Sequence, residues 1–410
     1  MRKTNLPIKL RCFQTVDGKA RGILLNARTF EPSIAGSLYE TSLSRKYASP
    51  NTLYHALSSA QILLSWAHDV GINLERRLLY GASLEPQDIE AFGHWLEAHH
   101  RGQANTLTRA GIRTYNAHLD GARRMVTWFV DRYYDASHAQ LPRGVLLDAL
   151  HETSKRAWKN QRIKDAADPE APDISDDDIS AIETFLRNAA ICKYPERRWI
   201  RAYLIWRLAI EFGLRIGEIL ALRLEDCPSR VNPAFRVVRI EDRDVISDSR
   251  SVYSPRPKTS GRDLAPILSN TVFPRLVIDY QADHRLKRVH RANGRVVWRP
   301  VLSHTYLLVN DDGDPLSVFT ARNLAKAIEK NTGVSFTWHL ARHAFFNRTY
   351  GAVAAIENPT QRTTRLSDLV YWGGWRDPRS LDCYVRRVRK ERARTGLAIW
   401  NGSNLWEALG

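Results

Sequence analysis

This 410-residue chain is divided near its middle by an acidic stretch that contains two prolines. Residues 165–178 read DAADPEAPDISDDD and hold almost nothing that a core could bury. Such a stretch is predicted to be an exposed linker. At its end Ser175 can cap a helix, and Ile179, Ile182 and Leu186 follow at helical spacing. Because the chain is also longer than one typical domain, we expect two domains joined here.

The part before the linker has the periodicity of helices. Ser49 and Pro50 are typical of a helix start, and apolar residues then recur at helical spacing as far as Gly71. Comparable patterns cover residues 84–100, 112–134 and 144–158. We therefore expect a helical N-terminal domain over residues 41–164. Residues 1–40 show little periodicity and are expected to form an arm or small appendage.

The part after the linker mixes helices with a short β-rich segment. Residues 197–212 are apolar on most sides, which predicts a buried central helix that ends at Gly213. Residues 235–267 include alternating, β-rich runs that predict a small sheet, and helical patterns return from Ala321. The fold class predicted for the whole chain is mainly α with a small antiparallel β-sheet. The second domain is expected over residues 179–395, followed by a tail over 396–410.

Positive charge is in excess along the chain. Its 61 Lys and Arg residues oppose 44 Asp and Glu, for a formal net charge of +17, and 48 of the 61 are arginines. Guanidinium groups hold phosphate in a bidentate fork, and nucleic acid is the commonest partner of basic proteins. A genome rich in G and C would also favour arginine codons, so the charge by itself leaves both explanations open.

Several classes of protein and of site lack their sequence signature. No stretch approaches the roughly 18 apolar residues of a membrane span, and the first residues lack the apolar core of a secretory signal. Four widely separated cysteines predict an intracellular protein without disulfides. The chain has no GxGxxG, GxxxxGK[ST] or GxSxG motif. His339 and His343 are spaced as in zinc peptidases, but Leu340 stands where the catalytic Glu would follow, so no metal and no cofactor are predicted.

An ordered set of chemically active residues remains in the second half of the chain. Its members are Arg215 with Glu218 in FGLRIGE, Lys258 in PRPKTSGRDLAPI, His339 and Arg342 in HLARHAF, Trp375 after two glycines, and Tyr384 nine residues later. In this order and spacing the sequence resembles the tyrosine recombinases, or phage-integrase family. The match covers the first arginine motif, the sheet lysine, the HxxRH box, the position that is His or Trp, and the tyrosine nucleophile. GGW replaces the usual LGH, and residues 351–370 are longer and more polar than usual.

The residues of this set suit phosphoryl transfer. Arg215 and Arg342 can clamp the non-bridging oxygens of a phosphodiester, and removing one such donor typically costs on the order of 100-fold in rate. Tyr384 supplies a phenol that can attack phosphorus, although Tyr350 and Tyr371 are nearby rivals. Lys258 is the candidate general acid for the leaving 5′-oxygen.

The other three members have supporting roles. His339 would assist proton removal from Tyr384 or bind a phosphate oxygen, and Glu218 would orient Arg215 or His339. Trp375 would pack against the site and offer its indole N–H. Taken singly, each of these residues has an ordinary structural explanation, as a core histidine, a surface acid or a packing aromatic. Their order in one chain favours the catalytic interpretation.

The resemblance implies a function and an assembly. It implies site-specific recombination of duplex DNA through 3′-phosphotyrosine intermediates without metal or ATP, and two domains that close as a C-shaped clamp around the DNA. It also implies a homo-tetramer at synapsis with accessory or directionality proteins, a cytoplasmic, nucleoid-associated location, and a C-terminal tail that contacts a neighbouring subunit. A type IB topoisomerase-like enzyme, a telomere-resolving enzyme and a catalytically idle DNA-binding protein remain as alternatives.

Overall fold

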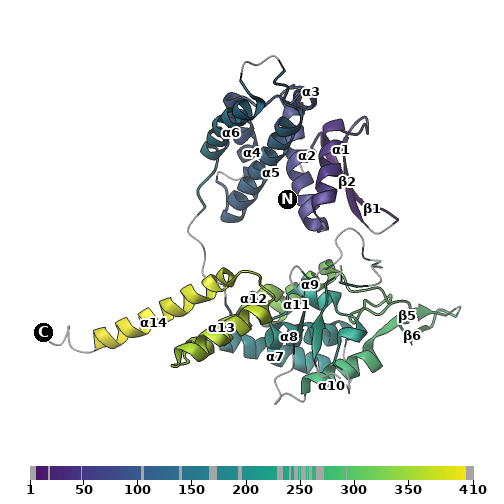
Figure 1. The fold of residues 1–410 in the computed structure, drawn as a ribbon. Helices are drawn as coiled ribbons and strands as arrows, with labels where there is room; N and C mark the ends of the chain where they lie inside the picture. The colour runs from purple at the N-terminus through teal and green to yellow at the C-terminus, as the bar shows by residue number, and fades with distance from the viewer. Residues whose placement is uncertain are drawn as a thin grey trace. The chain divides into compact units, whose positions relative to one another are not determined.

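The computed structural model describes residues 6–16, 19–47, 49–102, 106–137, 141–165, 173–192, 196–228, 234–239, 242–243, 248, 250, 255, 257, 261–264, 272–291 and 293–402. These residues form two compact units, the first before residue 168 and the second after it (Figure 1). The fold is mainly helical, and its described strands form three two-stranded antiparallel sheets. The predicted fold class is confirmed.

The N-terminal unit packs six helices and one β-hairpin around an apolar core. Its elements are β1 (Ile8–Gln14), β2 (Ala20–Asn26), α1 (Ile34–Lys46), α2 (Pro50–Asp69), α3 (Leu74–Leu79), α4 (Pro86–Arg101), α5 (Arg109–Tyr133) and α6 (Arg143–Asn160). The core is built on α2, α4 and α5, where Trp66, Phe92 and Phe129 are almost fully buried. Burial of such large side chains supplies most of the stabilisation of a helical unit.

Residues 6–40 differ from the arm or appendage that the sequence predicted. Leu24 of β2 is fully buried in the same core as α2, and an added Cβ on Gly22 would lie only 2.6 Å from Leu57. Arg21 of β2 also donates two hydrogen bonds of 2.8 Å to the Glu40 carboxylate of α1. The hairpin and α1 are therefore part of the unit. Few residues of this segment are buried, and that is why its periodicity is weak.

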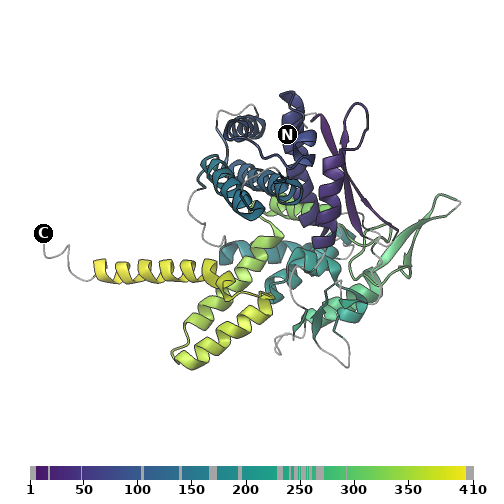
Figure 2. The same cartoon turned by 45° about the horizontal axis from the view of Figure 1, so that its top comes forward.

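The second unit is built around α8 (Arg197–Phe212), the helix predicted over 197–212. The other elements are α7 (Asp176–Ile191), α9 (Ile216–Ala221), η1 (Leu224–Asp226), β3 (Phe235–Val237), β4 (Arg262–Leu264), α10 (Val272–Asp279), the π-helical η3 (Tyr280–His284), β5 (Leu286–His290), β6 (Val296–Pro300), α11 (Val318–Thr332), α12 (Trp338–Ala354), α13 (Pro359–Gly373), η4 (Pro378–Leu381) and α14 (Asp382–Gly402). Helix α12 contacts both α13 and α14, and these helices are drawn in yellow-green to yellow in Figure 2.

The two predicted boundaries of the second domain are displaced. Ser175 caps α7 as predicted, but Ile174 is already buried in the second unit's core, and Arg348 binds the carboxylates of Asp173 and Asp176 at 3.3 and 2.5 Å. Residues 173–178 of the predicted 165–178 linker therefore belong to the second unit. At the other end, α14 passes through residue 396 without a break, and residues 403–410 lie outside the described part. No helix in the described part of the chain has the length and apolarity needed to cross a membrane.

Candidate active site

Arg342 occupies the centre of the candidate site. It lies on α12, is 2% exposed, and donates hydrogen bonds to the backbone oxygens of Gly213 and Gly373, the latter at 3.0 Å. Its guanidinium also lies 4.6 Å from the ring centre of Phe346 and 5.2 Å from that of Trp375. Backbone oxygens and aromatic faces both favour a cation, and their fixed positions hold the guanidinium in one orientation.

Glu218 gathers three arginines around one buried carboxylate. Arg215 is the N-cap residue of α9, so its backbone N–H and its Nη1 both reach Glu218, at 2.9 and 3.0 Å, while Nη1 also donates to Gly373 O at 3.1 Å. Arg262 of β4 binds the same carboxylate with two hydrogen bonds of 3.2 and 3.0 Å and donates to Trp372 O at 2.7 Å. Arg342 lies 4.0 Å from it. The sequence analysis had named Glu218 and Arg215 but not Arg262.

One carboxylate can neutralise only one of these three guanidinium groups. Burial would raise the pKa of Glu218, but Arg262, Arg342 and Arg215 outweigh it and lower that pKa, so the carboxylate is ionised at neutral pH. Burial, followed by repulsion from Arg215, lowers the pKa of Arg342 to about 9. Burial of positively charged groups is unfavourable because they lose hydration, and an anion bound next to them would offset that loss.

Tyr384 lies next to this cluster, in the first turn of α14. It is 2% exposed, its ring centre lies 5.8 Å from that of Phe346 and 5.9 Å from that of Trp375, and its hydroxyl lies 3.1 Å from Nδ1 of His343. With Nδ1 unprotonated, the hydroxyl donates this hydrogen bond. Burial raises the pKa of Tyr384, the neighbouring Cys383 raises it further, and Arg342 and Arg215 oppose the rise.

The histidine whose ring nitrogen lies within hydrogen-bond distance of the Tyr384 hydroxyl is His343, whereas the sequence predicted that His339 would either assist proton removal from Tyr384 or bind a phosphate oxygen. His339 is exposed, and its ring centre lies 4.2 Å from that of His343, one helical turn away. Burial, then His339 and Arg342, lower the pKa of His343 to about 4, so its imidazole is neutral at pH 7 and can accept the hydrogen bond from the Tyr384 hydroxyl. The HxxRH motif contains His343, but its contact with Tyr384, which lies 41 residues further along the chain, exists only in the folded unit.

Trp375 and the rival nucleophile Tyr371 lie in the described part of the chain, whereas Lys258 does not. Trp375 packs against Phe346 at a ring-centre distance of 4.6 Å, as predicted for a packing role. The rival Tyr371 is 56% exposed, and its hydroxyl accepts a hydrogen bond from the backbone N–H of Asp263. Lys258 lies outside the described residues, so its place relative to the arginines stays a prediction.

Two glycines allow the backbone oxygens to reach the arginines. Gly213 adopts a left-handed φ of 61° and an added Cβ would lie 2.4 Å from the ring of Phe345. At Gly373 an added Cβ would lie 2.3 Å from the ring of Trp375. Real Cβ atoms do not approach that closely, so both glycines are required by the contacts around the site.

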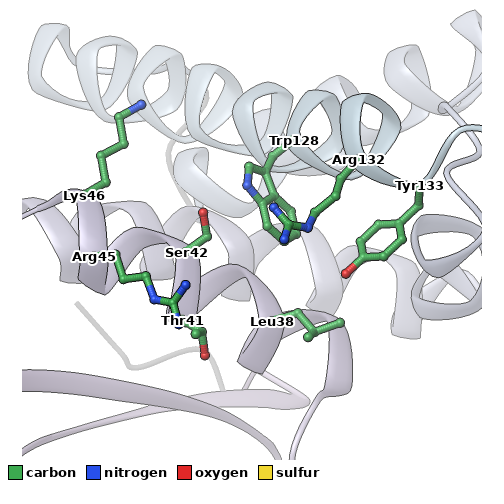
Figure 3. A pocket seen from close by; sticks show the side chains of 8 residues that line it. All are labelled: Leu38, Thr41, Ser42, Arg45, Lys46, Trp128, Arg132 and Tyr133. Carbon is green, nitrogen blue, oxygen red and sulfur yellow. The ribbon is translucent and has the colours of Figure 1, made fainter. Parts of the chain in front are cut away.

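The N-terminal unit contains a separate basic cavity of about 510 Å³ between α1 and α5 (Figure 3). Its lining includes Arg45, Lys46 and Arg132, and the guanidinium of Arg132 lies 5.5 Å from the ring centre of Trp128. All three cations stand near the last turns of their helices, where the helix dipole favours positive charge. Stabilisation of the two helix ends is thus enough to explain the positive charge of this cavity.

The similarities between this chain and known proteins are partial or distant. No family model matches the chain. Transposase A from transposon Tn554 of Staphylococcus aureus is 29% identical over 147 residues, which cover 35% of this chain and 34% of the transposase, so the match spans about a third of that relative's length. Among solved structures, the Tn1549 transposon integrase in complex with circular intermediate DNA is 15% identical, covering 82% of this chain and 99% of that one, with a TM-score of 0.46.

A second solved structure of the same kind is XerH site-specific recombinase bound to its difH substrate in a pre-cleavage complex. The two chains are 13% identical, and the match covers 88% of this chain and 85% of the XerH chain with a TM-score of 0.49. These two solved structures are described as a transposon integrase and a site-specific recombinase, each in complex with DNA.

Proposed function

We propose that this chain is a site-specific DNA recombinase of the tyrosine recombinase family, which cuts and rejoins duplex DNA through a 3′-phosphotyrosine intermediate. The observation that carries the proposal is the cluster of half-buried Arg215 with buried Arg262 and Arg342 around the buried carboxylate of Glu218, beside the hydroxyl of buried Tyr384. A site built in this way would attract an anion and hold a nucleophile next to it. The sequence motifs supply the reaction class.

Arg215 and Arg342 would bind the non-bridging oxygens of the scissile phosphate. Both donate to the same backbone oxygen, that of Gly373, so their guanidinium groups converge on one point. Negative charge on the phosphate increases as the fifth oxygen approaches phosphorus, and the guanidinium groups would stabilise that state more than the ground state. Arg262 is turned toward Glu218 and Trp372, so it would act by positioning rather than by contact with DNA.

Tyr384 would attack phosphorus with its phenol oxygen. As the Oη–P bond forms and the P–O5′ bond breaks, the phenol proton would pass to Nδ1 of His343, and the 5′-oxygen would leave as a hydroxyl with a proton from Lys258. His339, exposed next to His343, would bind a phosphate oxygen. Rejoining reverses these steps. Because the phosphotyrosine conserves the energy of the broken bond, the cycle requires neither a metal nor ATP.

The proposed assembly follows from the resemblance. The helical N-terminal unit would bind duplex DNA with the catalytic unit as a C-shaped clamp, four copies would meet at synapsis, and accessory proteins would set direction. The tail over 396–410 would dock on a neighbouring subunit, and the protein would work on DNA in the cytoplasm. The local similarity to transposase A of a transposon supports a role on a mobile element.

The test is denaturing capture of protein–DNA adducts from the native host, with sequencing of the attached ends. The wild-type chain is expected to form adducts that cluster at a few sequences, and Tyr384→Phe is expected to form none while it still binds DNA. Tyr371→Phe is the matched control, because it removes the same hydroxyl from an exposed tyrosine. Adducts that persist in Tyr384→Phe would contradict the proposed nucleophile.

The same experiment separates the alternatives. Scattered adducts that depend on Tyr384 would indicate topoisomerase-like relaxation, and covalently closed hairpin ends at a palindrome would indicate a telomere-resolving enzyme. DNA enriched under native conditions without any adduct would indicate a binding protein.

A further inference from the structure

The β5–β6 hairpin is an exposed ribbon of positive charge. Its residues, 286–300, include Lys287, Arg288, Arg291, Arg295 and Arg299 and contain no Asp or Glu. In Figures 1 and 2 it extends from the edge of the second unit, and most of its residues on both strands are exposed or half-buried. The sequence analysis assigned no structure to this segment.

The pairing of the strands places like charges side by side. Lys287 is directly opposite Arg299, and at the tip the backbone N–H of Arg291 donates to the backbone oxygen of Arg295 at 2.9 Å. Like charges at directly opposed positions destabilise a two-stranded sheet, and such a sheet is marginally stable by itself. One charge has a carboxylate close by, since Arg288 lies 3.3 Å from Asp312.

The base of the hairpin is firmly held although its tip is exposed. The buried Arg285 donates to the backbone oxygens of Val301 and Tyr306, which fixes both strands to the unit. The backbone N–H of Arg288 donates to Asp311 O at 2.7 Å. The fold thus maintains a charged, self-repelling ribbon in a defined position, which is expected of a binding element.

One face of the ribbon also presents exposed apolar side chains. Val296 is 42% and Trp298 39% exposed, and the guanidinium of Arg197 lies 4.0 Å from the ring centre of Trp298. Two strands of five residues extend about 17 Å, and a two-stranded ribbon fits the DNA major groove, which is about 12 Å wide. The ribbon therefore has the charge, the length and the cross-section of an element that enters a groove between two phosphate backbones.

We propose that the β5–β6 hairpin is a second DNA-binding element of this chain, which contacts the phosphate backbone of duplex DNA outside the cleavage site. The inference rests on the proposed function. The hairpin residues belong to no part of the cluster around Glu218, so the hairpin would contribute affinity and position rather than chemistry. Its basic side chains would release counterions on binding, which makes the contribution strongly dependent on salt.

The test measures binding to a duplex of about 40 base pairs between 50 and 200 mM salt. The variant combines Arg291→Gln, Arg295→Gln and Arg299→Gln. If each arginine neutralises one phosphate, the slope of log affinity against log salt is less steep in the variant than in the wild type by up to about 2.7. Between 50 and 200 mM salt, the affinity of the wild type therefore falls by about 40-fold more than the affinity of the variant. Arg275→Gln, Arg322→Gln and Arg365→Gln together are the control, because they remove the same charge from α10, α11 and α13. The control is expected to change the slope by less than one.

The outcomes are distinguishable from a failure of the proposed function. A wild-type chain that binds no duplex would refute the proposed function and this inference together. The inference alone would be refuted if the wild-type chain binds DNA and forms adducts but the hairpin variant has the same salt slope as the wild type or as the control. Lysine at the same three positions is expected to keep the slope, and its loss there would show that charge is not the cause. Self-association of the wild type that disappears in the glutamine variant, with DNA binding unchanged, would identify a protein partner instead and overturn the proposal.

Discussion

Replacing Arg262 with methionine is expected to destabilise the second unit more than any exposed arginine substitution. Methionine keeps the apolar stem but removes both hydrogen bonds to Glu218 and the one to Trp372 O. Breaking a buried ion pair from one side costs about 3–5 kcal/mol. Because Arg215 remains 3.0 Å from the carboxylate, we expect a value near the lower limit, about 3 kcal/mol.

The assay is urea unfolding followed by near-ultraviolet circular dichroism of the full chain. With a slope of about 3 kcal/mol per molar urea, a loss of about 3 kcal/mol lowers the midpoint of the second unit by about 1 M. Arg275→Met is the control, since the Arg275 side chain is 85% exposed, and it is expected to cost less than about 0.5 kcal/mol.

A double-variant cycle tests the stated cause. If the cost arises from the charge left on Glu218, Arg262→Met is expected to cost at least about 1 kcal/mol less in a Glu218→Gln background. Costs that add to within about 0.5 kcal/mol would show that Arg262 stabilises the unit by packing alone, and the electrostatic reasoning would be wrong.

Three further predictions concern other parts of the chain. Gly373→Ala places a Cβ 2.3 Å from the Trp375 ring and is expected to lower the free energy of unfolding by about 1–3 kcal/mol and to slow adduct formation. Urea unfolding measures the first effect and a single-turnover cleavage assay the second, and unchanged values would contradict the close packing. Burial, followed by repulsion from neighbouring histidines, lowers the pKa of His100 and of His118 to about 4, so the unfolded chain binds more protons than the folded chain between about pH 6.5 and 4. The N-terminal unit should therefore lose stability as the pH falls through that window. A urea midpoint of this unit that is independent of pH would refute the prediction. Deleting residues 396–410 is expected to leave DNA binding by the monomer intact but impair recombination in a plasmid assay, and full recombination would exclude the tail as a subunit contact.

Local signals predicted much of the fold. Helix α8 has the bounds expected from its apolar pattern because Gly213 adopts the left-handed conformation that ends it. Ser175 caps α7 with a hydrogen bond from the Asp178 N–H. The N-terminal segments β1, β2 and α1 were missed, because their burial depends on contacts with α2 that lie far away in the sequence.

The sequence by itself determined which residues of the candidate site share an element. Glu218 follows Arg215 by one helical turn, and His339, Arg342 and His343 lie together on α12, because helical spacing is a local property of the chain. Only the tertiary structure decided which groups meet across elements. It brought Arg262 to Glu218, Gly373 O to two arginines, and His343 to Tyr384. The packing of the whole unit decides which partner reaches a buried charged or polar group, because such a group is stable only when it is paired.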